Sequence, residues 1–69
     1  MLRLTIITPV FNEEAVLPRF NERTRAVLDS LADVDGRILY VMDKCTDESE
    51  RVLRRIVSAD ARTEAIVLS

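Results

Sequence analysis

The chain of 69 residues contains no histidine, no tryptophan and a single cysteine, Cys45. One cysteine forms no internal disulfide. Without histidine there is also no Ser-His or Cys-His catalytic pair and no cluster of histidine and cysteine metal ligands. The composition therefore excludes a disulfide scaffold and a triad hydrolase, and it fits a reducing, cytoplasmic setting.

Glycine is almost as scarce, because Gly36 is the only one in the chain. Phosphate-binding loops and dinucleotide-binding folds need several glycines in the turn after their first strand, and Gly36 comes too late to serve there. A receiver-type signalling domain would need an acidic pair after its first strand, where this chain reads Pro-Val-Phe-Asn at 9–12. The sequence disfavours all three classes.

Neither sign of charge dominates, since ten lysines and arginines stand against twelve aspartates and glutamates. No basic field is present to hold nucleic acid or an anionic membrane surface. The longest apolar run, 38–42, is too short to cross a bilayer, and the N-terminus lacks the apolar stretch of a signal peptide. We expect a soluble chain with no nucleic-acid partner and no membrane segment.

The first half of the chain predicts a strand followed by a helix. Residues 4–8 are apolar and β-branched, and Pro9, which has no N–H to donate, is expected to end that strand. Pro18 is tolerated only in the first turn of a helix, so the helix is predicted to begin near Leu17. Its predicted sheet-facing stripe consists of Leu17, Phe20, Thr24, Val27, Leu28 and Leu31.

The second half predicts a turn at 33–36, a strand at 37–42 covered on both faces, a second helix and a strand at 65–68. Thr46 or Asp47 is expected to cap the second helix, whose buried stripe is Val52, Leu53, Ile56 and Val57. The order βαβαβ predicts an α/β fold with a three-stranded parallel sheet in the order 3-2-1. Residues 1–69 form a single domain, incomplete and of marginal stability because a chain this short buries only about 60% of its unfolded surface.

Two polar stretches mark the place where function is expected. Thr-Pro-Val-Phe-Asn-Glu-Glu at 8–14 follows the first strand, and Val-Met-Asp-Lys-Cys-Thr-Asp at 41–47 spans the end of the second. Parallel α/β sheets bind ligands at the carboxyl ends of their strands. In these residues the chain resembles the start of a family 2 (GT-A type, Rossmann-like) glycosyltransferase, closest to the polyprenyl- or dolichol-phosphate sugar transferases. The resemblance runs over nearly all of the chain and covers only the N-terminal part of such an enzyme.

The resemblance implies that Pro9, Phe11, Glu13 and Asp43 line the nucleotide of a UDP- or GDP-sugar, with Asp43 accepting a hydrogen bond from the base. It implies inverting sugar transfer to a polyprenyl phosphate or another glycan or lipid acceptor, with the parent enzyme at the cytoplasmic face of the membrane. The family's Asp-x-Asp, which holds Mg²⁺ or Mn²⁺, lies beyond this point. We therefore assign no catalytic and no metal-binding residue here, and we expect the 69-residue chain to be inactive alone.

Each of these residues also has a plainer interpretation. Pro9 could simply end a strand, Phe11 could be a core or lid aromatic, and Glu13 could be a solvated carboxylate near a helix start. Asp43 is the hardest to explain in this way, because an ionised carboxylate at the end of a buried strand needs a partner.

The chain departs from the family pattern in the second stretch. Met42 replaces the first aspartate of an Asp-Asp pair, and Lys44 and Cys45 replace Gly-Ser. Asp-Val-Asp at 33–35 matches the letters of a metal motif in the wrong loop. The alternative function is a non-catalytic, truncated α/β binding or interaction module whose exposed sheet edge pairs with another chain, a second copy included.

Overall fold

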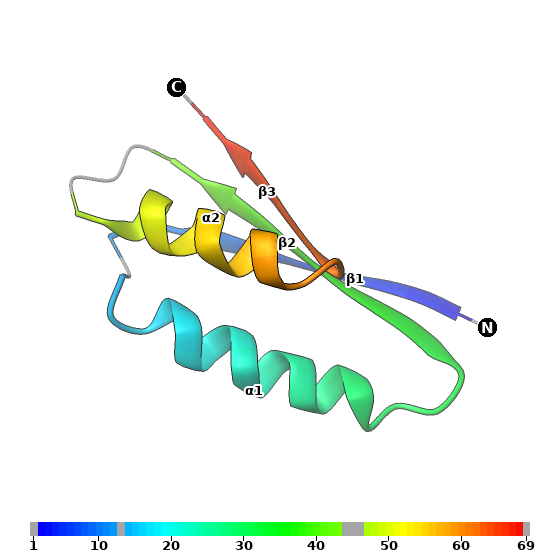
Figure 1. The fold of residues 1–69 in the computed structure, drawn as a ribbon. Helices are drawn as coiled ribbons and strands as arrows, with labels where there is room; N and C mark the ends of the chain where they lie inside the picture. Colours follow the sequence, from blue (N-terminus) through cyan, green and yellow to red (C-terminus); the bar gives the residue numbers. More distant parts are fainter. Residues whose placement is uncertain (1, 13, 44–46, 69) are drawn as a thin grey trace.

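The computed structural model describes residues 2–12, 14–43 and 47–68, and within them the protein is an α/β structure (Figure 1). Its elements are β1 (Leu2–Val10), α1 (Leu17–Asp29), β2 (Val34–Met42), α2 (Ser49–Ala59) and β3 (Thr63–Val67). The sheet is parallel throughout, in the order β1-β2-β3. Val10 pairs with Met42, and Met42 pairs with Val67, so the three strands end at one edge of the sheet.

Both helices lie on the same face of the sheet (Figure 1). A right-handed crossover after β1 and another after β2, both advancing in one direction across the sheet, place their helices on one side. The prediction that the second strand is covered on both faces is therefore wrong. Ile38, Tyr40 and Met42 point toward the helices and are buried, whereas the alternate residues Leu39 and Val41 remain half-exposed.

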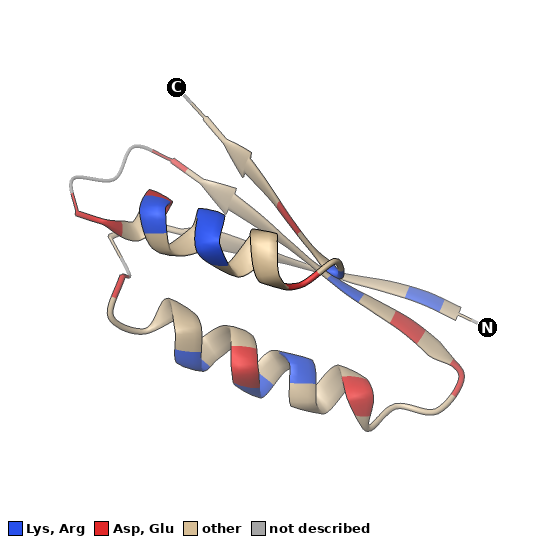
Figure 2. Cartoon of the chain, viewed as in Figure 1, with Lys and Arg blue, Asp and Glu red and all other residues tan. Residues whose placement is uncertain are grey.

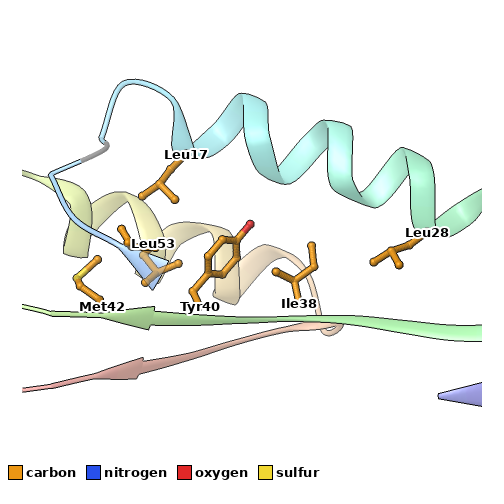
Figure 3. Close-up of a cluster of buried hydrophobic side chains, with 7 residues drawn as sticks. Leu17, Leu28, Ile38, Tyr40, Met42 and Leu53 are labelled. Carbon is orange, nitrogen blue, oxygen red and sulfur yellow. The ribbon is translucent and has the colours of Figure 1, made fainter. Parts of the chain in front are cut away.

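The core lies between this face and the helices (Figure 3). Its buried members are Val10, Leu17, Leu28, Ile38, Tyr40, Met42 and Leu53. In α2 the predicted stripe is confirmed, with Leu53 buried and Val52, Ile56 and Val57 packed against the core.

The start of α1 is confirmed at Leu17, with Pro18 in the first turn, but the predicted stripe is only partly correct. Leu17 and Leu28 are buried, whereas Phe20, Val27 and Leu31 are 39%, 58% and 41% exposed. A sheet-facing position falls to Asn21, which is buried. The predicted stripe covered too wide an arc of the helix and ran past its end. Phe20 and Val27 therefore lie on the flank away from α2, and Leu31 follows the helix.

The strand boundaries also differ from the prediction. The third strand, predicted at 65–68, is observed as Thr63–Val67, and β1 and β2 are both longer than predicted. Leu2 N donates to Asp33 O, so the backbone donors of even-numbered β1 residues point toward β2 and those of odd-numbered residues point away. Pro9 therefore needs no N–H inside the sheet, and β1 continues to Val10. At the other end, the predicted turn at 33–36 is mostly strand. Among these four residues, only Asp33 has a positive φ, of 58°, and β2 begins at Val34.

Within the described part of the chain, neither helix is long and apolar enough to cross a membrane.

Candidate functional site

The carboxyl ends of β1 and β2 bring two of the predicted site residues to one edge of the sheet. Because Val10 pairs with Met42, Phe11 and Asp43 each follow a paired residue on adjacent strands. The Phe11 side chain is 64% exposed, and Asp43 is exposed as well. Pro9, paired with Val41, is exposed just before this edge. Glu13, the fourth predicted residue, lies outside the described residues, as do Lys44 and Cys45.

Asp47 joins the loops that leave the two strands. Its Oδ2 accepts a hydrogen bond from Glu14 N at 3.3 Å, and its own backbone N donates to Asn12 Oδ1 at 3.4 Å. Asn12 adopts a φ of 47°, a left-handed conformation that asparagine tolerates better than most residues. The described parts of the two loops are thus held together beside Phe11 and Asp43 by a residue that the resemblance does not place in the site.

Asp47 also organises the start of α2, because its Oδ1 accepts a hydrogen bond from Ser49 N at 3.0 Å. Glu48 occupies the N-cap position and makes no side-chain capping bond, so the predicted capping bond comes from Asp47, one residue earlier; the alternative, Thr46, lies outside the described residues. Hydrogen bonds from the Ser49 side chain, then from the backbone of Ser49 and Glu14, hold the pKa of the Asp47 carboxyl below its usual range. The ionised carboxylate therefore anchors the backbone here.

The described residues of this edge are mostly acidic (Figure 2). Glu14, Asp43, Asp47 and Glu48 all lie in the loops that follow β1 and β2. Arg51 approaches Glu48, with 3.9 Å between Nη1 and Oε2. Among the described residues, no group of three or more acidic or other ligand side chains is placed to hold a metal ion. In the described part of this edge, a nucleoside would meet an open apolar ring and carboxylate acceptors, whereas a diphosphate would meet negatively charged side chains.

A second polar site, absent from our sequence analysis, lies beneath the helices. Tyr40 is fully buried in β2, and its hydroxyl donates to Asn21 Oδ1 at 2.6 Å. A groove of about 570 Å³ runs between α1 and α2 above this pair, lined in part by Arg25, Arg55 and Asp60. The signal was present in the sequence: Asn21 is four residues after Leu17 and seven before Leu28, so it shares their side of α1.

Asp60, one of the two acidic residues that line this groove, has a structural role. Asp60 is 8% exposed and follows α2; its Oδ1 accepts a hydrogen bond from Arg62 N, and its carbonyl accepts one from the Thr63 hydroxyl at 2.7 Å. Arg25 Nε lies 2.9 Å from Asp60 Oδ2 and neutralises it. These contacts fix the turn into β3 and attach α1 to it. Arg25 and Asp60 are thus each other's partners, which argues against a catalytic role for this pair.

The stability of the fold is expected to fall at alkaline pH because of Tyr40. Burial, and to a smaller extent the charge of Asp60, raises the pKa of the Tyr40 hydroxyl to about 12 from the ordinary value of 10.0. The unfolded chain then loses its proton at lower pH than the folded chain. The stability that the buried Tyr40 hydroxyl contributes is fully present below pH 10 and is lost as the pH rises toward 12. At pH 11 the loss amounts to roughly 1 kcal/mol.

Urea unfolding at pH 8 and pH 11 measures this loss. The variant Tyr40→Phe is the control, and its stability should lack this component of the pH dependence. Since Tyr40 is the only tyrosine and tryptophan is absent, phenolate absorbance reports its pKa directly in the native chain. A midpoint near pH 10 in the folded protein would contradict the buried Tyr40–Asn21 pair.

Comparison of the chain with protein-family models, with curated proteins and with solved structures found no match.

Proposed function

We propose that this chain is the N-terminal, nucleotide-sugar-binding part of a family 2-like glycosyltransferase, with a GT-A, Rossmann-like arrangement of its strands. The observation that carries the proposal is the pairing of Val10 with Met42. It brings together the two motif residues with the most specific roles in the resemblance, Phe11 and Asp43. In this proposal the parent enzyme transfers a sugar, with inversion, from a UDP- or GDP-sugar to a polyprenyl phosphate or another glycan or lipid acceptor.

The proposed roles follow from the chemistry of the side chains. Phe11 offers an open aromatic face on which a nucleobase stacks, and base–aromatic stacking contributes about 1–3 kcal/mol. Asp43 is an exposed carboxylate that accepts a hydrogen bond from a base N–H. Pro9 stiffens the end of β1 just before Phe11 and contributes apolar surface. Asp47 positions the loops through Asn12 and Glu14.

The described residues do not fit the Mg²⁺ or Mn²⁺ ion that the resemblance implies for a full-length enzyme. They contain no group of three metal ligands, and the carboxylates of the edge are distributed over two loops. No step of the reaction is therefore assigned to this chain. Its proposed contribution is to bind the nucleoside and to orient it at the strand ends.

Weak nucleotide binding that depends on Asp43 is the expected result. In ligand-detected NMR with UDP and GDP, Asp43→Ala should weaken binding by about 1–3 kcal/mol because one charge-assisted hydrogen bond is lost. Phe11→Ala should also weaken binding, while the fold persists because the ring is 64% exposed. Addition of Mg²⁺ should change the affinity of the isolated chain little.

The matched control is Asp35→Ala, which removes the same charge from the opposite end of β2. It should leave the affinity within error of the native chain. Equal binding by the native chain and Asp43→Ala would show that Asp43 does not read the base. Absence of binding to every nucleotide of the panel would favour the alternative, a non-catalytic interaction module. That alternative has its own support in the exposed apolar surface beside β1.

A further inference from the structure

The free edge of β1 presents a row of backbone groups that another extended chain can pair. In the order β1-β2-β3, β1 has a neighbour on one side alone. Since Leu2 N points toward β2, the N–H and C=O groups of Arg3, Thr5 and Ile7 point outward. Soluble proteins usually protect such an edge with charges, bulges or proline. In β1 the protection is limited to Arg3 near the start and Pro9 near the end.

The flank of α1 on the same side is apolar and uncovered. Pro18, Asn21 and Arg25 line the groove between the two helices and therefore mark the side of α1 that faces α2. The opposite flank of α1 lies toward β1. This flank contains a hollow of about 470 Å³ with Phe20 and Val27 in its wall. Its other lining residues are Val16, Arg19, Arg23 and Thr24.

Leucine side chains project from the amino end of β1 on the same side of the sheet as this hollow. Leu2 and Leu4 have the same parity as buried Val10 and therefore point to the helix side of the sheet. No helix covers them fully, and they are 73% and 42% exposed. The projecting leucines therefore lie at one end of β1, and the part of the hollow beside Phe20 lies toward the other end.

We propose that a second copy of this chain occupies this surface through antiparallel pairing of the two β1 strands, forming a two-fold dimer with a continuous six-stranded sheet. In the register that we infer, Thr5 lies opposite Thr5 on the axis, Arg3 opposite Ile7, and Leu4 opposite Ile6. Every outward donor of the described strand from Arg3 to Ile7 is then paired, and Pro9 lies outside the ladder.

A second copy of the chain is the occupant that fits this surface, because each half of the surface matches the other half on the second copy. A two-fold axis at Thr5 brings the amino end of each β1 to the carboxyl end of the other, so Leu2 of each copy approaches the other's hollow beside Phe20. Arg3 is the only charged residue of β1, and this register keeps it away from Arg3 of the second copy. A register centred on Arg3 would oppose two cations, and one centred on Ile7 would place Pro9 in the ladder. The β3 edge is shorter, at five residues, and carries Glu64.

Sedimentation velocity over micromolar to millimolar concentrations tests the dimer. We expect the mass to rise from one chain to two with concentration, and Thr5→Pro to remain monomeric at every concentration. The Thr5 N–H points away from β2, so the substitution removes no bond of the β1–β2 ladder, and the far-ultraviolet circular dichroism of this variant should match that of the native chain. A native chain that sediments as a monomer throughout would overturn the proposal.

Charged residues introduced at Thr5, on the two-fold axis, test the proposed strand register independently of folding. Thr5→Lys and Thr5→Glu should each weaken the dimer about fivefold, because like charges face each other across the strands, and an equimolar mixture should recover the native affinity. The control Glu64→Lys, on the other edge of the sheet, should change nothing. Failure of the mixture to recover, or loss of the dimer in Glu64→Lys, would overturn the assignment to β1. Neither outcome depends on whether the chain binds nucleotides.

Discussion

Replacing Leu53 with alanine is expected to lower the free energy of unfolding by about 2–5 kcal/mol. Leu53 is 1% exposed and extends from α2 toward Met42 and Tyr40 of β2 (Figure 3). A chain of this size has a total stability of only about 3–10 kcal/mol. The variant should therefore be largely unfolded under conditions in which the native chain is folded, and urea titration followed by circular dichroism measures the difference.

The matched control for this change is Leu31→Ala. Leu31 follows α1 and is 41% exposed, so the same chemical truncation should lower the stability by less than about 1 kcal/mol. Equal losses in the two variants would mean that α2 is not packed on the sheet as described. The comparison should be made at low protein concentration, where dimerisation contributes least to stability.

The seating of α2 also matters for the candidate site. Asp47 connects the start of α2 to Asn12 and Glu14, the residues that follow β1. A displaced α2 would therefore separate the loops that position Phe11 and Asp43. Nucleotide binding should be lost in Leu53→Ala together with the fold, whereas Asp43→Ala should affect binding alone.

The general architecture could be predicted because the strongest signals were local. Pro18 set the start of α1, since proline is accepted only in the first helical turn. The spacing of apolar residues from Val52 to Val57 identified the buried side of α2. Helix-length connections between apolar runs then required parallel strands, which places Phe11 and Asp43 at one edge.

The remaining features depend on partners distant in sequence. Turn-forming residues at 33–36 lie mostly in β2 because Leu2 and Leu4 pair with Val34 and Gly36. Asn21 is buried because Tyr40, 19 residues later, supplies a hydrogen bond to its amide. The linkage of Asp47 to Asn12 spans 35 residues. No local propensity encodes such contacts, and the roles of Pro9, Phe11, Glu13 and Asp43 stay predictions until binding is measured.

Substitution of Gly36 by alanine is expected to destabilise the fold by about 1–3 kcal/mol through overpacking. Gly36 is buried in β2 beneath the last turn of α1. A Cβ atom built there would lie 2.6 Å from Leu28 Cδ2 and 2.9 Å from Leu28 Cβ. The Cδ2 atom can rotate away, whereas Cβ moves only with the helix backbone, so α1 must shift from the sheet.

The sign of this effect is informative, because backbone entropy alone predicts the opposite. Gly36 does not have a positive φ, and at such a position alanine usually stabilises a protein by about 0.4–1 kcal/mol through the unfolded state. A double-mutant cycle with Leu28→Ala separates the two contributions. In the Leu28→Ala background the cost of Gly36→Ala should fall, since Cδ2 is gone, but should not vanish, since Leu28 Cβ remains. A stabilised Gly36→Ala variant would mean that α1 does not approach β2 this closely.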